Sequence, residues 1–591
     1  MQITLDELQK KVNETEAKIH ESPETLAMLQ GTADVLTDMA KDSKKITVLT
    51  DYDADGITSG YIIQKTIETL NPKCEVDVRP NDRRGAYGLS EQALQSGDFG
   101  KDFGDGLIIL DMGSNQIPLL EQAYGNGAIV IDHHLIESED VRETINGNNY
   151  YCNCHAISDN DKDNAQYCTA GLAYRLYELT GCKELASECQ NNTVVAMAAI
   201  GTAADMVDVL DENSFNRNIL KAGVQAVDNA EPENFDSVIG YMLKKVRISE
   251  TTTAHELAFN AGAFLNAGGR MSEIIEENGA ARIYAALNAP EDKAGTYKEI
   301  NRLQFINATR KDLVAQLTSS PEYLQQVELE KFGENRENNI AVITLPPDTP
   351  HAFAGLVAGK FQETTDKAVI CLAQNTKTGN WSGSGRNPES NETSLMEFMK
   401  LALEGRDIDI KYGGHSDAIG VSKLNDIEAF KQAINENMDK MVRKDKSELI
   451  TIPAAEFNAP DVLDKVKALE PIGTGFQIPA VQLEGTETYR NKYFKSGKKE
   501  WKTVKITQEG VGYDVADWSY DERAYPQSGK KGNEIELTAR VGLSSYGGEH
   551  IEFTASFNRD MFLDRVRELD IPPFVPEVPE QAEKADIPPN I

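Results

Sequence analysis

The stretch ITVLTDYDADGITSG, residues 46–60, decides how the first part of this chain is understood. Its three alternate aspartates and glycine match the start of a calcium-binding EF-hand loop, which ends in a bidentate glutamate at its twelfth position. Counted from Asp51, that position is Ile62, which cannot bind an ion. The apolar, β-branched run before the aspartates also predicts a buried strand, whereas an EF-hand loop follows a helix. The aspartates therefore belong to another kind of site.

The length and composition indicate a folded protein of several domains. The chain has 591 residues, 40% of them hydrophobic, so we expect three or four domains. It contains no apolar run of membrane-spanning length and no signal-peptide core. Its seven cysteines predict reduced thiols in the cytoplasm. Cys152 and Cys154 stand too close in the sequence for a usual zinc knuckle, so free thiols are favoured there.

The net charge leaves a nucleic-acid partner open. The chain carries 60 basic and 95 acidic side chains, a formal charge of −35. Because phosphate binding rests on lysine and arginine, this balance by itself counts against nucleic acid. Clustered carboxylates can however bind divalent cations, and a local basic patch can act within an acidic chain.

Alternating strands and helices predict an α/β fold in the first half of the chain. Short Val/Ile-rich strands are expected at 46–50, 75–80, 107–111 and 128–132. This alternation is typical of a parallel sheet with helices on both faces, and such sheets bind ligands beyond the carboxyl ends of their strands. Asp51, Asp111 and Asp132 stand at three of these strand ends. We therefore expect one acidic edge of the sheet.

Changes in residue pattern and composition indicate further domains in the remaining chain. A helical connector, with one long helix over 297–317, separates the first α/β domain from a second, smaller one. A β-rich barrel follows, and a proline-rich acidic tail is expected to be disordered. The predicted boundaries are 1–245 for the first domain with its N-terminal helices, 246–335 for the connector, 336–447 for the second α/β domain, 448–568 for the barrel and 569–591 for the tail.

Carboxylates and imidazoles in this first domain are candidate metal ligands. The residues are Asp51, Asp53, Asp55, Asp111, His133, His134 and Asp205. The adjacent histidines would more often be a surface pair if they stood alone, and Asp132 before them is a candidate partner that fixes a ring tautomer. Oxygen ligands with two imidazoles suit Mn²⁺ or Mg²⁺ better than structural zinc. A carboxylate that bridges two such ions is the centre of two-metal phosphoryl hydrolysis.

Two basic segments are candidates for phosphate binding. The segment NKYFKSGKKEWK, residues 491–502, places Lys498, Lys499 and Trp501 in the predicted barrel, where lysines among aromatic residues suit a single-strand groove. A lysine-capped hairpin tip explains that segment equally well. In RPNDRRGAYGLS, residues 79–90, Arg84 is a candidate phosphate-facing residue, although a solvated turn is as plausible.

Several motifs resemble those of a known superfamily. DYDADG (51–56), ILDMGSN (109–115), IDHH (131–134) and GTAAD (201–205) resemble motifs I to IV of the DHH phosphoesterases. GGHSDAIG (413–420) resembles the signature of the associated DHHA1 domain. Three further segments are similar to RecJ single-strand exonucleases: FLNAGGRMSE (264–273), SGSGR (382–386) and LEPIGTGFQIPAV (469–481). The resemblance extends over about residues 45–560 and implies an OB-like nucleic-acid-binding domain as the barrel.

The resemblance implies a role for each matching residue. Asp53 and Asp55 would bind separate ions bridged by Asp111, and His133 and Asp205 would complete the second site. His134 would contact metal or the scissile phosphate, so that Asp111, His134 and Asp132 form the catalytic group. Substrate phosphates would be held by Arg270, Ser384, Arg386 and His415. Many family members have a histidine where this chain has Leu49, so Asp51 or water would have to supply that ligand.

The resemblance implies a RecJ-like exonuclease that hydrolyses single-stranded DNA 5′-to-3′ with two Mn²⁺ or Mg²⁺ ions, in repair, recombination or replication. A small-substrate DHH phosphodiesterase, acting on cyclic dinucleotides or short RNA, remains an alternative, although such relatives generally lack the barrel. A catalytically impaired scaffold is the third, favoured weakly by Leu49. The expected partner is single-stranded DNA, with single-stranded-DNA-binding protein or other repair proteins open. The expected setting is a bacterial cytoplasm, or the host's for a phage protein.

Overall fold

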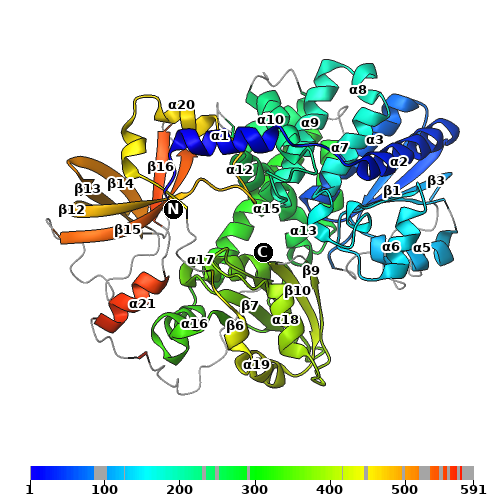
Figure 1. Ribbon diagram of the computed structural model, residues 1–591. Helices are drawn as coiled ribbons and strands as arrows, with labels where there is room; N and C mark the ends of the chain where they lie inside the picture. The colour runs from blue at the N-terminus through cyan, green and yellow to red at the C-terminus, as the bar shows by residue number, and fades with distance from the viewer. Residues whose placement is uncertain are drawn as a thin grey trace.

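The structure, a computed structural model, has three sheets joined by helices (Figure 1). Among its described residues, no helix combines the length and apolar character needed to cross a membrane. The predicted tail at 569–591 lies outside the described residues except for 573–574. The structure describes residues 2–84, 89, 103–125, 127–228, 235–246, 252–288, 293–414, 417–444, 450–494, 500–517, 533–544, 550–555, 559–568 and 573–574.

Two helices precede the first sheet. Helix α1 (Leu5–Glu16) begins at Thr4, whose side chain forms a capping box with Glu7. Helix α2 (Pro23–Asp42) begins after Ser22, which caps it, with proline at the first helical position. The N-terminal helices expected in the first domain are therefore α1 and α2.

The first sheet has five parallel strands in the order β2-β1-β3-β4-β5. They are β1 (Lys45–Thr50), β2 (Glu75–Pro80), β3 (Gly106–Leu110), β4 (Ile129–Ile131) and β5 (Tyr151–Cys152). The four predicted strands are confirmed, and β5 was missed because two residues carry no periodic signal. Alternate side chains enter different cores: Ile46 and Val48 pack with one hydrophobic cluster, and Leu49 packs with the other.

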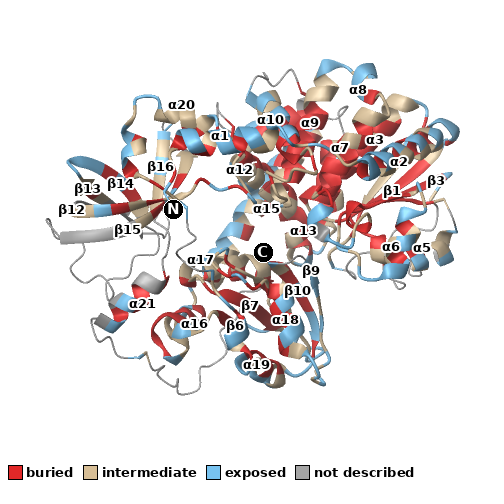
Figure 2. Cartoon of the chain, viewed as in Figure 1, coloured by how far each residue is buried: buried red, intermediate tan, exposed pale blue. Residues whose placement is uncertain are grey.

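Buried helices pack beside this sheet and carry or contact several of the candidate ligands (Figure 2). Helices α3, α7 and α9 pack against one another and are buried over most of their length. Their sequences are accordingly apolar on most sides, with small residues where the helices meet. The helices of this part are α3 (Ala54–Leu70), α5 (Ile117–Tyr124), α6 (Glu139–Asn146), α7 (Thr169–Leu179), α8 (Cys182–Leu185), α9 (Glu188–Ala204), α10 (Asn216–Asp228) and α11 (Ser237–Lys245).

The connector is helical, as predicted. Its long helix α15 (Lys293–Leu317) contains the predicted helix 297–317 and begins four residues earlier. Before it lie α12 (Ala254–Glu256), a π-helical turn (Leu257–Gly262), α13 (Ala263–Ile275) and α14 (Gly279–Leu287), and after it lies α16 (Pro321–Phe332). Short 3₁₀ turns occur at Ser114–Gln116, Cys154–Ala156, Asp161–Asp163, Glu334–Glu337, Met438–Lys440 and Ala454–Asn458.

The second α/β domain has a mixed sheet in the order β6-β7-β8-β10-β9, in which only β6 and β7 are parallel. Its strands are β6 (Ile340–Thr344), β7 (Ala368–Gln374), β8 (Trp381–Arg386), β9 (Lys411–Gly414) and β10 (Ala418–Leu424). Its helices are α17 (His351–Thr365), α18 (Leu395–Leu403) and α19 (Ile427–Asn435).

The C-terminal part is a closed five-stranded barrel, as predicted. Pairing of β12 with β15 closes the order β12-β13-β14-β16-β15, and β11 adds to β12. The elements are β11 (Thr451–Ile452), α20 (Val462–Lys467), β12 (Ala480–Phe494), β13 (Glu500–Gln508), β14 (Val511–Asp517), β15 (Asn533–Ser544) and β16 (His550–Ala555).

A terminal helix, α21 (Arg559–Glu568), was not expected from the sequence. It packs where the connector meets the second α/β domain: Phe562 and Phe332, the last residue of α16, meet edge to face at 5.1 Å between ring centroids. Arg559 is buried and donates hydrogen bonds to Asn339 Oδ1 and to the Arg336 carbonyl. The helix is therefore held by another domain, which its own sequence does not indicate.

Candidate metal centre

Three aspartates extend the ends of parallel strands at one edge of the first sheet. Asp51, Asp111 and Asp132 directly follow β1, β3 and β4. Each continues the ladder through its amide, to the carbonyls of Leu110 (3.3 Å), Ile131 (3.0 Å) and Cys152 (3.0 Å), respectively. The expected acidic edge is therefore present, and backbone pairing fixes it.

Asp53 and Asp55 lie at the start of α3. Asp53 caps the helix, accepting hydrogen bonds from the amides of Asp55 and Gly56. Asp55 is buried, and its two oxygens accept the amides of Thr169 (2.8 Å) and Ala170 (2.7 Å) at the start of α7. Helix α9 approaches this carboxylate closely at Gly201, because a Cβ there would lie 3.2 Å from Asp55 Oδ1.

His133 lies at the centre of the cluster, with carboxylates at both ring nitrogens. Its Nε2 lies 3.3 Å from Asp111 Oδ1 and 3.8 Å from Asp55 Oδ2, and its Nδ1 lies 3.6 Å from Asp205 Oδ2. Asp205 comes from the C-terminal cap of α9. Burial and the neighbouring His134 lower the pKa of His133 to about 4, so the ring is neutral at physiological pH, the form that binds metals.

His134 is oriented by Asp132. The Nδ1 of His134 lies 2.7 Å from Asp132 Oδ1, and the other carboxylate oxygen accepts the amide of Ser114 at 2.9 Å. Burial opposes the charge on this ring, but Asp132 outweighs it and raises the pKa of His134 to about 9. Burial likewise opposes the charge on Asp132, yet His134 and several amide donors hold the pKa of Asp132 below its usual range. Asp132 therefore orients the His134 ring, and its role in fixing a ring tautomer stays a prediction, because the protonated ring carries hydrogens on both nitrogens.

Asp111 is held in a strained backbone conformation. Its φ is 61°, in the left-handed region that side-chain-bearing residues seldom adopt. The residue is buried, and Thr169 Oγ1 donates a hydrogen bond to its Oδ1 at 3.3 Å. Such strain is maintained only when the surrounding structure enforces it, and it is concentrated at functional sites.

The residues fit a site for divalent cations. Three groups have ligand atoms within 4.8 Å of one another: Asp111 with His133 and His134, Asp55 with His133 and Asp205, and Asp51 with Asp53 and Asp111. Asp51 Oδ1 is buried and has no hydrogen-bond partner among the described residues. Burial, reinforced by neighbouring carboxylates, raises the pKa of Asp51 to about 8, of Asp55 to about 6 and of Asp205 to about 8. Cations would relieve this repulsion, and the donor set suits Mn²⁺ or Mg²⁺.

Leu49 cannot join this donor set. Its side chain is fully buried in the hydrophobic cluster that contains Leu107 and Ile109, on the sheet face opposite Val48. The unpartnered Asp51 Oδ1 is instead the atom available for coordination near the end of β1.

A group of arginines lies between the two α/β domains. Arg270 of α13 donates a hydrogen bond to the Ala352 carbonyl of α17 at 3.3 Å. Arg386, at the end of β8, donates to Ser384 Oγ at 2.9 Å, and a Cβ at Gly355 would lie 3.0 Å from its Nη2. Within the described part of the chain, no carboxylate forms an ion pair with Arg270 or Arg386. Burial and the nearby Arg83, Arg310 and Arg386 lower the pKa of Arg270 to about 9.

The other expected substrate residues have different outcomes. Arg84 is paired with Asp82 and donates to the Glu276 carbonyl, so it does not present an unengaged guanidinium. His415, Lys498 and Lys499 lie outside the described residues, and of Trp501 only its strand pairing opposite Tyr493 is described. Arg83 belongs to the basic segment that was expected to face phosphate, whereas His351 and Arg310 were not singled out in the sequence.

Arg83, His351 and Arg310 each have an identifiable place. Arg83 lies over the Tyr52 ring at 4.7 Å, directly beside the aspartate motif. His351 places its Nε2 2.9 Å from the Gly383 carbonyl, and Arg310 is buried on α15. Arg83 stands in the basic segment already noted, but the positions of His351 and Arg310 follow only from domain packing.

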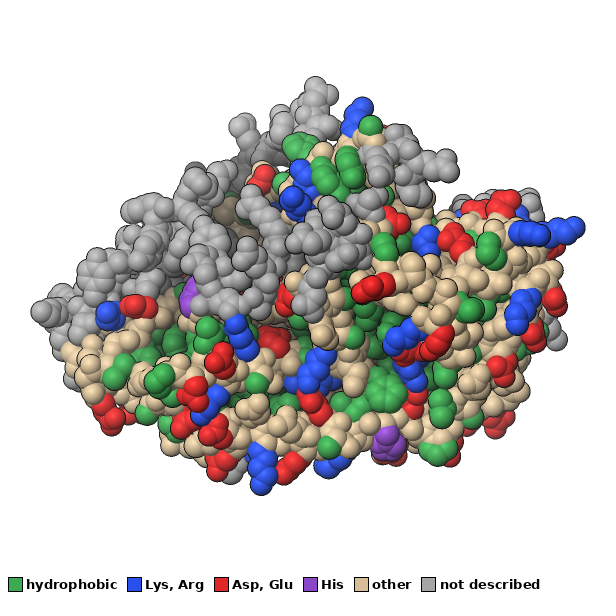
Figure 3. Space-filling model, turned by 90° about the horizontal axis from the view of Figure 1, so that it is seen from above, with side chains coloured by type: hydrophobic (Ala, Val, Ile, Leu, Met, Phe, Trp, Pro, Cys, Tyr) green, Lys and Arg blue, Asp and Glu red, His purple; other side chains and the backbone are tan. Residues whose placement is uncertain are grey.

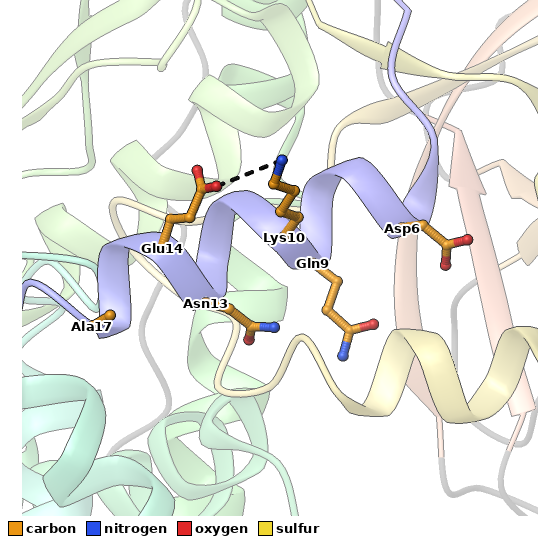
Figure 4. A pocket seen from close by; sticks show the side chains of 6 residues that line it. All are labelled: Asp6, Gln9, Lys10, Asn13, Glu14 and Ala17. Atoms are coloured by element: carbon orange, nitrogen blue, oxygen red, sulfur yellow. Dashed lines mark ion pairs between the residues drawn. The ribbon is translucent and has the colours of Figure 1, made fainter.

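Among the described residues, no other surface feature brings together a comparable group of metal ligands. Acidic and basic side chains are interspersed over the face seen in Figure 3. A shallow depression runs along α1 (Figure 4), where Lys10 and Glu14 form an exposed ion pair at 3.8 Å. It is lined by Asp6, Gln9, Lys10, Asn13, Glu14 and Ala17, which bring together no group of metal ligands.

Two family models match this chain, one in each α/β domain. The family "DHH family, N-terminal domain" matches residues 45–202, and the "DHHA1 domain" matches residues 337–440. The single-stranded-DNA-specific exonuclease RecJ of Bacillus subtilis is 25% identical over 465 residues, 76% of this chain and 53% of that protein. The RecJ of Haemophilus influenzae is 23% identical over 574 residues, 93% of this chain and 92% of that protein.

The fold is also similar to a solved structure. The crystal structure of RecJ from Thermus thermophilus in complex with Mn²⁺ has a TM-score of 0.64 and 21% identity. The match covers 89% of this chain and 71% of that one. The chain thus contains a DHH-family N-terminal domain followed by a DHHA1 domain, on a fold similar to that of RecJ.

Proposed function

We propose that the protein is a metal-dependent exonuclease that hydrolyses phosphodiester bonds of single-stranded DNA, from the 5′ end, in repair, recombination or replication. The observation that carries the proposal is the cluster of carboxylates around His133, with ligand groups that share Asp111. The names of the RecJ relatives support the substrate. The seven free cysteines are compatible with a cytoplasmic setting, and single-stranded-DNA-binding protein is a candidate partner.

The ion ligands divide into two sets. Asp51 and Asp53 would hold one ion and Asp55, His133 and Asp205 the other, with Asp111 between them. Two Mn²⁺ or Mg²⁺ ions would supply activation of water and stabilisation of negative charge on the phosphate.

The chain's own residues orient the substrate. Because Asp132 keeps the His134 ring protonated, His134 is placed to offer positive charge to the scissile phosphate. Arg270 and Arg386, which face no carboxylate partner in the described structure, would bind phosphates from the side of the second domain. The strand end would thus lie between these arginines and the metal centre.

The test is hydrolysis of end-labelled oligonucleotides. In Mn²⁺ or Mg²⁺ we expect a 3′-labelled single strand to be shortened progressively and a 5′-labelled one to lose its label at once. Both should remain intact in EDTA, and duplex DNA of the same sequence should be resistant. Single-stranded RNA and a dinucleotide are the comparison substrates. Cleavage of the dinucleotide alone would replace this proposal with the small-substrate phosphodiesterase, and absence of hydrolysis in every metal would favour the scaffold.

Substitution of Arg386 by glutamine is expected to raise the KM for single-stranded DNA about tenfold to a hundredfold. A hydrogen bond to a charged group contributes about 1.5–3 kcal/mol, and Arg386 has no other anionic partner among the described residues. The value of kcat should change less, because the metal ligands are untouched. The matched control is Arg406→Gln, which removes an arginine paired with Glu436 in the same domain. Equal KM values for both variants would remove Arg386 from substrate binding.

A further inference from the structure

The loop that carries Asp205 is held by the segment that enters the barrel. Asp205 ends α9, and the next residue, Met206, is exposed with φ 59°, in the left-handed region. Three residues later Val209 is buried, and its amide donates a hydrogen bond to the carbonyl of Thr474 at 2.9 Å. A strained, exposed backbone directly after a metal-ligand position must be held in place by its neighbours.

The contact on the barrel side is a tight turn at 473–476. Gly473 and Phe476 exchange two backbone hydrogen bonds of 2.9 and 3.0 Å. Gly475 has φ +76°, and a Cβ there would lie 1.9 Å from Asp208 Oδ1. A Cβ at Gly473 would lie 3.1 Å from Val209 Cγ1. The turn therefore touches Asp208 and Val209 so closely that only glycine fits without displacement.

Hydrogen bonds hold both the Asp205 loop and the segment that leads into the turn. Asp208 Oδ1 accepts the amide of Leu210 at 2.7 Å, and its carbonyl accepts Asn216 Nδ2 at 3.1 Å. Arg217, the next residue on α10, is buried and donates to the carbonyls of Leu469 (3.0 Å), Glu470 (3.1 Å) and Pro471 (2.7 Å), while its Nε is paired with Glu16 of α1. The segment that leads into the turn is thus attached to α10 through Arg217, and the Asp205 loop is attached to the same helix through Asn216.

Other segments pack against the end of α9, from which the Asp205 loop begins. The π-helical turn (Leu257–Gly262) packs on the end of α9, where a Cβ at Gly262 would lie 2.7 Å from Ala204 Cβ. The segment from α20 to β12 passes close to α12 in Figure 1, and the Ala254 amide hydrogen-bonds the Glu470 carboxylate. Displacement of the turn would therefore move the Asp205 loop, because the close contact of Gly262 with Ala204 leaves the end of α9 little room to move.

We propose that the turn 473–476 is a positioning element for the metal centre: it sets the place of the Asp205 carboxylate through Asp208 and Val209, so that docking of the barrel determines how tightly the site binds divalent cations. This inference rests on the metal site of the proposed function. Residues that orient metal ligands from outside the coordination sphere typically change affinity about tenfold to a hundredfold when altered.

The test compares three glycine-to-alanine variants of the full chain by calorimetric titration with Mn²⁺. Gly475→Ala is expected to weaken Mn²⁺ binding about tenfold or more, and Gly473→Ala by a smaller factor because its contact is looser. Gly510→Ala is the matched control, since Gly510 has φ +85° in the barrel but a Cβ there meets nothing within 4 Å. The control should bind Mn²⁺ like the unaltered chain.

Melting temperatures separate positioning from general loss of stability. The proposal is supported if Gly475→Ala binds Mn²⁺ most weakly, Gly473→Ala binds it less weakly and Gly510→Ala binds it like the unaltered chain. Equal Mn²⁺ affinities overturn it even if Gly475→Ala melts at a lower temperature. If Gly475→Ala does not fold, Gly473→Ala against Gly510→Ala decides in the same way. An unaltered chain that takes up no Mn²⁺ would refute the proposed metal site itself, whereas normal binding and cleavage by all variants would refute only the positioning role.

Discussion

Replacing Asp111 by asparagine is expected to reduce hydrolysis of single-stranded DNA about a thousandfold or more. Asp111 is the carboxylate shared by two of the three ligand groups, and His133 lies 3.3 Å from it. Metal-ion stabilisation of the phosphate is worth several kcal/mol, and each 1.36 kcal/mol corresponds to about tenfold in rate. An amide of the same shape retains the volume of the side chain but loses the charge.

The same substitution should leave the metal-free protein folded. Burial and the neighbouring Asp55, Asp53, Asp51 and Asp205 raise the pKa of Asp111 well above its usual range, so removing this carboxylate relieves repulsion. We expect the melting temperature of Asp111→Asn without metal to equal or exceed that of the unaltered chain. The control is Asp38→Asn, which changes an exposed aspartate on α2 and should retain full activity. Near-normal cleavage by Asp111→Asn would contradict the bridging role.

Removal of divalent cations is expected to abolish hydrolysis, and restoration by Mn²⁺ should depend steeply on pH. Burial raises the pKa of Asp51 to about 8 and of Asp205 to about 8, so in the absence of metal these groups bind protons at pH 6. A cation must displace those protons, and a higher pH therefore favours binding. Between pH 6 and pH 8 we expect apparent Mn²⁺ affinity to rise about tenfold to a hundredfold.

The stability of the metal-free protein should change in the opposite direction. Because the folded pKa values lie above the ordinary 3.8, the folded state binds more protons than the unfolded chain between about pH 4 and pH 8. These carboxyls therefore cost stability progressively as pH rises through that interval, and Mn²⁺ should restore it. Calorimetry in buffers of different ionisation enthalpy counts the protons released, and scanning calorimetry with EDTA or Mn²⁺ follows the melting temperature. Mn²⁺ affinity independent of pH would contradict the assignment of these groups as ligands.

Patterns carried by neighbouring residues could be predicted from the sequence. The β-branched run at 46–50 and the strands after it have the period and length of a buried parallel sheet, so their ends place Asp51, Asp111 and Asp132 at one edge. The long helix α15 follows from apolar residues at helix spacing. The closed barrel follows from successive short strands with turns between them.

Contacts between segments distant in the chain could not be predicted. Arg310 and His351 carry no local signal, because their place near Arg270 arises only when α13, α15 and α17 pack together. The helix α21 has few apolar residues of its own and is held by Phe332 and Asn339, more than two hundred residues earlier.

The sequence by itself determined which residues are candidate metal ligands, their strand-end positions and the order of the domains, because those depend on local periodicity and on motifs of a few residues. Only the tertiary structure decided that both ring nitrogens of His133 face carboxylates, that Asp51 Oδ1 lacks a partner among the described residues, and that Gly475 touches Asp208. These are distances between side chains on different elements. They are set by how helices and sheets pack, since close packing admits few arrangements and no single segment encodes them.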